Sequence, residues 1–235
     1  MIRVEKVTKS YQSGKVKVRA LNDVSLEVKK EEMVVLSGPS GSGKSTMLNI
    51  IGCLTRITEG RLWLADQEVS HFPDHFLAAI RREKIGFIFQ QFNLLKGYST
   101  WENVSSPLLP LGISEKERRI RAMKLLEELN LETRADFMAN ELSGGEQQRA
   151  AIARALINDP EIILADEPLS NIDMGHVRMV IDILRELKKR GKTIIVSSHE
   201  LQTPMAGLVD RTVYFDSGKI LDGRRDEYWV MEDRP

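Results

Sequence analysis

The stretch "GPSGSGKST" at residues 38–46 constrains the fold of this chain more than any other part of the sequence. It matches the pattern G-x-x-x-x-G-K-[ST], with the apolar run "MVVLSG" leading into it and the helical run "MLNIIGCL" after it. Its glycines allow a backbone path whose N–H groups point at phosphate oxygens, Lys44 places a cation near the terminal phosphates, and Ser45 offers a hydroxyl to Mg²⁺. The stretch therefore predicts a strand, a phosphate-binding loop and a helix, with a nucleoside triphosphate and Mg²⁺ as ligands. The residues expected to bind the nucleotide here are Gly38, Pro39, Ser40, Gly41, Ser42, Gly43, Lys44, Ser45 and Thr46.

Short apolar runs alternate with helical patterns along the chain, which indicates an α/β domain with a mainly parallel sheet. The runs expected to be strands are 33–38, 84–90, 161–167 and 192–199. They are nearly continuous in apolar residues, as is typical of strands covered on both faces. Helices are expected over 114–131 and from Val177 to about Gly191. Because the sequence has no repeat and no linker-like tract, we predict one domain over 1–235 with a helical insertion at about 92–142.

An acidic pair follows the third of these apolar runs, in "IILADEP". In a chain with a phosphate-binding loop, Asp166 can support the Mg²⁺ shell and Glu167 can polarise an attacking water. We therefore expect both carboxylates in a hydrolytic site.

The overall charge is balanced, with 34 Lys and Arg against 34 Asp and Glu. No net field favours a polyanionic partner, so nucleic acid is not an expected ligand. The start of the chain lacks a signal-peptide core, and no apolar run approaches the roughly 20 residues that cross a bilayer. The lone cysteine, Cys53, suits a reducing cytosol and is expected to be a small buried residue on a helix.

A second glycine-containing turn opens the helical run "LSGGEQQRAAIARAL". Ser143 and Glu146 have the spacing of a capping box, so the segment could be only a well-made helix start. That interpretation leaves Gly144 and Gly145 unexplained, because bare backbone at a helix N-terminus lets an anion approach closely. We therefore expect a second anion site at this turn.

The three motifs "GPSGSGKST", "LSGGEQQR" and "ILADEP" together resemble the phosphate loop, signature and Walker B motifs of ATP-binding-cassette (ABC) ATPases. The resemblance covers nearly the whole chain. It implies a P-loop nucleotide-hydrolase core, an N-terminal antiparallel β subdomain and an inserted α-helical subdomain. It also implies that the signature of one subunit, Ser143 to Glu146 here, closes over the ATP held by the phosphate loop of a second subunit.

The same resemblance implies roles for further residues in this sequence. Tyr11 resembles the aromatic residue that stacks on adenine, and Gln90 the residue that links Mg²⁺ to the helical subdomain. Ser170 and Asp173 resemble the D-loop, and His199 the histidine that contacts the γ-phosphate. The implied catalytic set is Glu167, His199 and Gln90, and the implied metal ligands are Ser45, Gln90 and Asp166.

Within the family, "GFIFQQFNLL" and "GCLTRITEG" resemble the lipoprotein-releasing and macrolide-export type of ATPase subunit. The sequence departs from that branch at three places. Leu169 stands where threonine is common, "LADQEV" at 64–69 lacks an Asp-Gly turn, and Glu31 stands where many relatives have glycine. None of these changes removes a catalytic group.

The sequence thus predicts a cytosolic ATPase subunit that dimerises around ATP and drives a separate membrane permease from the inner face of the membrane. Two alternatives stay open: an ATPase that gates cell-wall hydrolases through a membrane partner, and an ABC protein that acts on ribosomes or DNA. His71 and His75 are interpreted as a surface pair because no third metal ligand is near in sequence. The tail at about 222–235 is interpreted as a partly ordered terminus.

Overall fold

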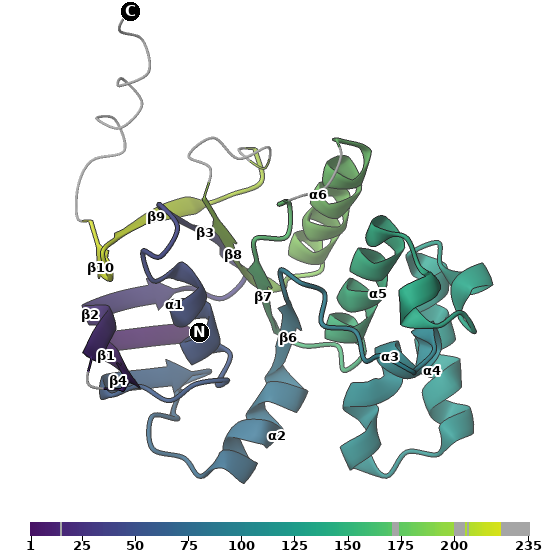
Figure 1. The fold of residues 1–235 in the computed structure, drawn as a ribbon, viewed down its shortest axis with the longest axis horizontal. Coiled ribbons are helices and arrows are strands. Elements are labelled where there is room, and N and C mark those ends of the chain that lie inside the picture. Colours follow the sequence, from purple (N-terminus) through teal and green to yellow (C-terminus); the bar gives the residue numbers. More distant parts are fainter. Residues whose placement is uncertain (15, 171–173, 200–204, 206, 222–235) are drawn as a thin grey trace, which may run out of the picture.

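The structure is a computed structural model that describes residues 1–14, 16–170, 174–199, 205 and 207–221. Within these residues the strands form a sheet of six strands and a sheet of four (Figure 1). The strands are β1 (Ile2–Ser13), β2 (Val16–Val28), β3 (Met33–Ser37), β4 (Glu59–Leu64), β5 (Gln67–Glu68), β6 (Ile85–Ile88), β7 (Ile162–Asp166), β8 (Thr193–Ser198), β9 (Arg211–Asp216) and β10 (Lys219–Ile220). The helices are α1 (Lys44–Ile51), α2 (Asp74–Lys84), α3 (Thr100–Ser105), α4 (Glu115–Glu128), α5 (Gly144–Leu156) and α6 (Met174–Lys189), with short 3-10 turns η1 (Ser106–Leu111), η2 (Glu132–Arg134) and η3 (Ala139–Glu141).

The larger sheet has the strand order β10-β9-β3-β8-β7-β6. Strands β9, β3, β8, β7 and β6 run parallel, and β10 pairs antiparallel with β9. The four predicted strands are β3, β6, β7 and β8, and they lie side by side. The expectation of a mainly parallel sheet is confirmed.

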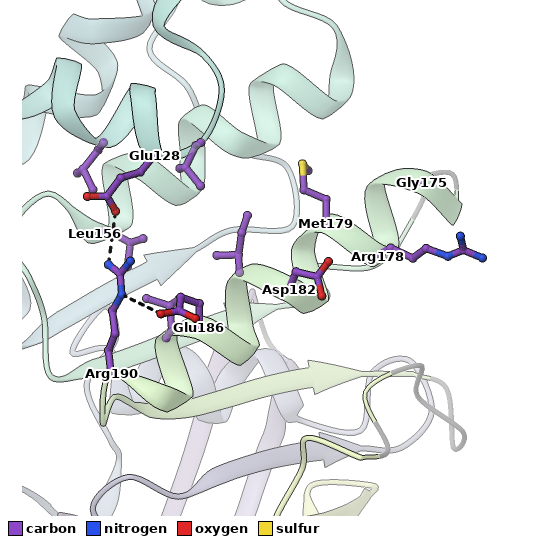
Figure 2. Close-up of a pocket in the computed structure, with 12 residues that line it drawn as sticks. Glu128, Leu156, Gly175, Arg178, Met179, Asp182, Glu186 and Arg190 are labelled. Atoms are coloured by element: carbon purple, nitrogen blue, oxygen red, sulfur yellow. Dashed lines mark hydrogen bonds and ion pairs between the residues drawn. The ribbon is translucent and has the colours of Figure 1, made fainter.

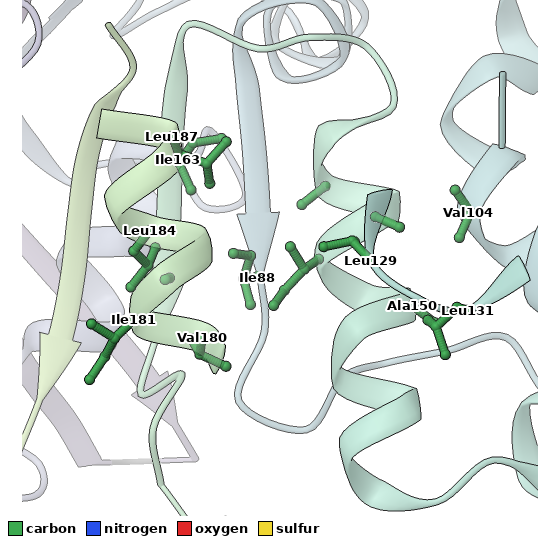
Figure 3. Close-up of a cluster of buried hydrophobic side chains, with 14 of the residues drawn as sticks. Ile88, Val104, Leu129, Leu131, Ala150, Ile163, Val180, Ile181, Leu184 and Leu187 are labelled. Atoms are coloured by element: carbon green, nitrogen blue, oxygen red, sulfur yellow. The ribbon is translucent and has the colours of Figure 1, made fainter. Parts of the chain in front are cut away.

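This sheet separates two hydrophobic cores. Side chains of β3 alternate between them, with Met33 and Val35 in one core and Val34 and Leu36 in the other. The first core is closed by α5, α6 and the helical segment, and Figure 3 shows Leu187 of α6 beside Ile163 of β7. The second core is closed by α1 and the smaller sheet. Burial on both faces explains why these strands have no polar alternation in the sequence.

The smaller sheet is antiparallel, with the order β2-β1-β4-β5, and it confirms the expected N-terminal β subdomain. The stretch "LADQEV" forms the turn between β4 and β5 although it lacks glycine. Ala65 and Asp66 both take positive φ values, 49° and 68°, as a mirror-image two-residue hairpin turn requires. Glu31 has a φ of 64°, so the position where relatives carry glycine does need a left-handed residue.

Between β6 and β7 the chain is helical, from α3 through α5 (Figure 1). Helix α4 begins as expected, with the Ser114 side chain accepting a hydrogen bond from the backbone N–H of Glu117. It ends at Glu128, earlier than the predicted 131. Asn130 takes a φ of 54° and the N–H of Leu131 donates to the Leu126 carbonyl at 2.7 Å, which closes the helix with a left-handed turn.

The structure also places the lone cysteine and the histidine pair noted in the sequence. Cys53 is buried, but it is not on a helix: it follows α1 with a φ of 54°, and burial raises the pKa of its thiol to about 11. His71 and His75 are exposed, and the described residues contain no group of three or more His, Cys, Asp or Glu suited to a metal.

Candidate active site

The phosphate loop, residues 38–46, connects β3 to α1 at the carboxyl edge of the central sheet. Its glycines are required by close backbone contacts as well as by conformation. Gly38 has a φ of 141° and a Cβ there would lie 2.1 Å from the Phe215 carbonyl oxygen; at Gly43, with a φ of 109°, it would lie 2.7 Å from that of Ala20. Because Gly43 is the N-cap of α1, the first turn of this helix has no capping side chain beside it. Its N–H groups therefore suit an anion.

Lys44 is buried, with 4% of its surface exposed, and its amine lies inside the loop. The amine donates hydrogen bonds to the carbonyl oxygens of Gly38 at 2.7 Å and Pro39 at 2.9 Å. Burial lowers the pKa of this amine, while the charges of Glu167 and Asp166 oppose the shift. The Lys44 amine is thus held inside the phosphate loop, near the carboxylates of Asp166 and Glu167.

Two carboxylates meet the loop at the end of β7. The Ser45 hydroxyl donates to Asp166 Oδ1 at 3.0 Å, which joins the first turn of α1 to β7. Glu167 follows directly with a φ of 46°, a sparsely populated conformation for a non-glycine residue. The sequence placed all three residues in one site, and the structure brings them together.

Two side chains from neighbouring strand ends converge on the carboxylate of Glu167. Gln90, just after β6, donates from Nε2 to Glu167 Oε2 at 2.8 Å. His199, just after β8, has Nδ1 at 3.5 Å from the same oxygen. They meet because β6, β7 and β8 are parallel and end at the same edge of the sheet. A cavity of about 30 Å³, lined in part by Glu167, Ser170 and His199, lies beside them and is large enough for a water molecule.

The remaining predicted residues lie around this centre. Ser170 donates from Oγ to the Glu167 carbonyl at 2.8 Å, whereas Asp173 and the tail at 222–235 lie outside the described residues.

Tyr11 is on β1 opposite Val18. Its side chain is 41% exposed, and the Lys9 amine lies 4.7 Å from the centre of its ring. Because β2 continues from Val18 to Ala20, beside Gly43, the ring is on the hairpin that borders the phosphate loop.

The signature turn, residues 143–146, begins α5 with the predicted capping box. Glu146 Oε2 accepts from the Ser143 N–H at 2.8 Å, and Arg134 donates to Glu146 Oε1 at 2.8 Å. These contacts, the Ser143 N–H first, lower the pKa of Glu146 to about 2. Helix α5 packs in the first core and α1 in the second, so the central sheet separates this turn from the phosphate loop (Figure 1).

The two glycines of the signature turn have different surroundings. A Cβ on Gly144 would meet nothing within 4 Å, so this residue offers bare backbone to an approaching group. A Cβ on Gly145 would lie 1.9 Å from Nε2 of His176, at the start of α6. Gly145 is thus explained by packing within the chain, which the sequence reasoning did not anticipate.

Three further residues near the site were not predicted. Ser197 on β8 donates to Asp166 Oδ1 at 2.6 Å, and Gln148 on α5 donates to the Pro168 carbonyl at 2.5 Å. Arg154, also on α5, donates to the carbonyls of Phe92 and Asn93, which follow Gln90. The available signals were weak: a serine two positions before His199 on a strand, and polar residues on the apolar face of a helix.

This fold and site define the class of P-loop nucleotide hydrolases. Residues 21–170 match the family described as "ABC transporter". An uncharacterized ABC transporter ATP-binding protein of Thermotoga maritima is 49% identical over 83% of this chain and 84% of its own length. The macrolide export ATP-binding/permease protein MacB of Hyphomonas neptunium is 43% identical over 100% of this chain, which spans 36% of that protein.

A solved structure of an ATP-binding cassette also matches this chain in fold. The ATP-binding cassette MJ0796 of Methanocaldococcus jannaschii, described as dimeric, post-hydrolysis and bound to ADP and Pi, superposes with a TM-score of 0.87 at 43% identity. The match covers 94% of this chain and 96% of that one. This chain therefore belongs to the ABC transporter ATP-binding family, and it is an ATP-binding, ATP-hydrolysing protein. No helix among the described residues is long and apolar enough to cross a membrane.

Proposed function

We propose that the chain, as one ATPase domain over 1–235 with a helical insertion at about 92–142, forms a homodimer around two MgATP and drives a separate membrane permease. It would lie at the inner face of the membrane through that permease. The observation that carries the proposal is the separation of the two anion-suited turns by the central sheet. A signature turn that cannot close on its own phosphate loop is available for the loop of a second copy. The dimeric cassette of M. jannaschii, 43% identical, supports this arrangement.

ATP binding is assigned to the phosphate loop and the β1–β2 hairpin. Backbone N–H groups of residues 38–46 would surround the phosphates, and Lys44 would exchange its two carbonyl contacts for phosphate oxygens. Tyr11 would stack on adenine, since its ring is exposed on the hairpin beside the loop.

The residues implied as metal ligands fit Mg²⁺. The Ser45 hydroxyl, the Asp166 carboxylate and the side-chain oxygen of Gln90 are hard oxygen donors, and Ser45 and Asp166 are already hydrogen bonded to each other. Few protein ligands are expected, because Mg²⁺ keeps several waters and binds substrate phosphates. Bound there, Mg²⁺ would neutralise charge on the β- and γ-phosphates.

Hydrolysis is assigned to Glu167. The cavity beside its carboxylate has room for the attacking water, whose proton Glu167 would accept as the water oxygen bonds to the γ-phosphorus and ADP departs. Gln90 and His199 hold the carboxylate from two sides, and His199 would contact the γ-phosphate. Glu167 takes a left-handed backbone conformation directly after β7, and its charge acts on the Lys44 amine of the phosphate loop.

A groove between α2, β6 and η1 is a candidate surface for the permease. It has a volume of about 310 Å³ and is lined in part by Phe87, Phe89, Pro107 and Arg154. Other apolar side chains of α2 and η1 are exposed, Phe76 at 53%, Leu109 at 53% and Leu111 at 45%, so an apolar partner segment could cover them. Arg154 lines this groove and also holds the segment after Gln90, which offers a physical connection from partner to active site.

The proposed roles in catalysis are tested with two variants. Lys44→Ala should abolish ATP hydrolysis and weaken binding of a fluorescent ATP analogue, because backbone N–H groups cannot replace its charge. Glu167→Gln should keep nucleotide binding while kcat falls by roughly 10²–10⁴-fold, as for loss of a general base. Wild-type turnover in either variant would contradict the assignment, and loss of binding in Glu167→Gln would indicate a structural role instead.

A further inference from the structure

A buried hydroxyl on β8 connects both carboxylate residues of the active site. Ser197 is fully buried and pairs with Asp166 in the parallel register of β7 and β8. Its Oγ donates to Asp166 Oδ1 at 2.6 Å and accepts from the backbone N–H of Glu167 at 2.9 Å. A serine hydroxyl has one proton, which here is donated to the Asp166 carboxylate, while its oxygen accepts a hydrogen bond from the Glu167 amide. Ser197 is thus a hydrogen-bond donor to Asp166 and a hydrogen-bond acceptor for Glu167, the next residue.

The backbone of Glu167 depends on contacts of this kind. Strand β7 ends at Asp166, and Glu167 turns to a φ of 46°, a conformation that persists only when surrounding contacts fix it. Ser197 accepts its N–H, and Ser170 donates to its carbonyl oxygen, from N at 3.2 Å and from Oγ at 2.8 Å. Both peptide groups of Glu167 are therefore held by serines from neighbouring segments.

The carboxylate of Asp166 is held from two directions. Its Oδ1 accepts from Ser45 on α1 and from Ser197 on β8. Ser45 belongs to the phosphate loop, so its hydroxyl would reorient when a nucleotide and metal bind. Ser197 is fully buried and outside the loop, so its hydrogen bond can persist with the ligand bound.

Ser197 lies on β8, and His199 directly follows the last residue of this strand. Both side chains contact residues at the end of β7, Ser197 through Asp166 and His199 through Glu167. His199 Nδ1 is 3.5 Å from the Glu167 side chain, and Ser197 holds the Glu167 backbone. Residues 197–199 at the end of β8 therefore contact Glu167 at both its side chain and its main chain.

The geometry points to Ser197 as a positioning residue for hydrolysis, which rests on the proposed roles of Asp166 and Glu167. Its hydroxyl fixes the direction of the Asp166 carboxylate and the turned backbone that aims Glu167. The hydroxyl bonds to Asp166 and Glu167 and not to the phosphate-loop groups that bind the nucleotide. Removing this hydroxyl therefore lowers kcat and raises the free Mg²⁺ concentration needed for half-maximal rate, while KM for ATP changes little.

The test compares Ser197→Thr with Ser197→Val, which have the same shape and differ only by the hydroxyl. Steady-state ATPase rates are measured against ATP and, separately, against free Mg²⁺, with thermal melts to confirm folding. Hydrogen bonds to charged groups are strong, so we expect kcat of Ser197→Val to fall about tenfold, while Ser197→Thr stays within about threefold of wild type. The half-saturating Mg²⁺ should rise a few-fold in Ser197→Val alone.

Equal kcat and Mg²⁺ values in the Thr and Val variants, whether both normal or both reduced, would overturn the role of the hydroxyl. If the added methyl group unfolds both variants, Ser197→Ala carries the test: a kcat at the wild-type level with normal Mg²⁺ dependence would overturn the inference. Glu167→Gln, measured in parallel, separates this outcome from failure of the proposed function. Normal turnover in Glu167→Gln would contradict the catalytic assignment itself, whatever Ser197 does.

Discussion

The contact between Gly145 and His176 leads to a stability prediction with a built-in control. A Cβ at Gly145 would lie 1.9 Å from His176 Nε2, so Gly145→Ala must displace the imidazole from α5. A displaced ring loses its contacts with α5, which should make Gly145→Ala less stable than Gly144→Ala by about 1–2 kcal/mol. Gly144→Ala is the control, because a Cβ there meets nothing within 4 Å and alanine favours a helical turn.

Urea unfolding of the four combinations of Gly145→Ala and His176→Ala measures the coupling directly. In the His176→Ala background the Gly145→Ala change should be no more harmful than Gly144→Ala is in the wild type, because the ring is gone. Any other contact that His176 makes is lost equally in both arms of the double-mutant cycle, so it cancels in the coupling energy. The reasoning would be refuted if Gly145→Ala were as stable as Gly144→Ala, or if the effect of Gly145→Ala were the same with and without the imidazole.

Two further predictions concern pH and the β4–β5 turn. The pKa of Glu146 is about 2 in the fold against 4.5 in the unfolded chain, so its charge stabilises the fold above pH 4.5, and this contribution is lost as pH falls toward 2. The stability difference between wild type and Glu146→Gln, from urea unfolding, should therefore shrink between about pH 5 and pH 3; a constant difference would contradict this. Asp66→Gly should raise the free energy of unfolding by about 0.5–1 kcal/mol, because glycine adopts positive φ without steric penalty. A destabilised variant would show that the Asp66 side chain itself supports the turn.

Much of the active site was predictable because it is built from strand ends. Parallel strands bury both faces, so β6, β7 and β8 are recognisable as apolar runs, and the polar residues after each run must meet at one edge. The structure brings Gln90, Glu167 and His199 together at that edge, and the family resemblance had implied a shared site for them. The phosphate loop was equally predictable, since its pattern specifies a backbone path.

Other features depend on contacts between distant segments and could not be predicted from local pattern. The end of α4 is set by a left-handed Asn130, and Gly145 is needed because His176, on a different helix, lies against it. Ser197 is one polar residue at the end of a buried strand, and only the register with β7 places its hydroxyl on Asp166.

The central claim, that the signature turn reads the ATP of a second subunit, is tested most directly by the mass of the Glu167→Gln protein in solution. If ATP is shared between chains, blocking hydrolysis should let the dimer accumulate by mass action. Size-exclusion chromatography with light scattering should show a monomer without nucleotide, a dimer with ATP and a monomer with ADP. Adding Ser143→Arg should abolish the dimer while a fluorescent ATP analogue still binds. An ATP-dependent dimer that survives Ser143→Arg would contradict the account and leave the signature turn as only a capped helix start.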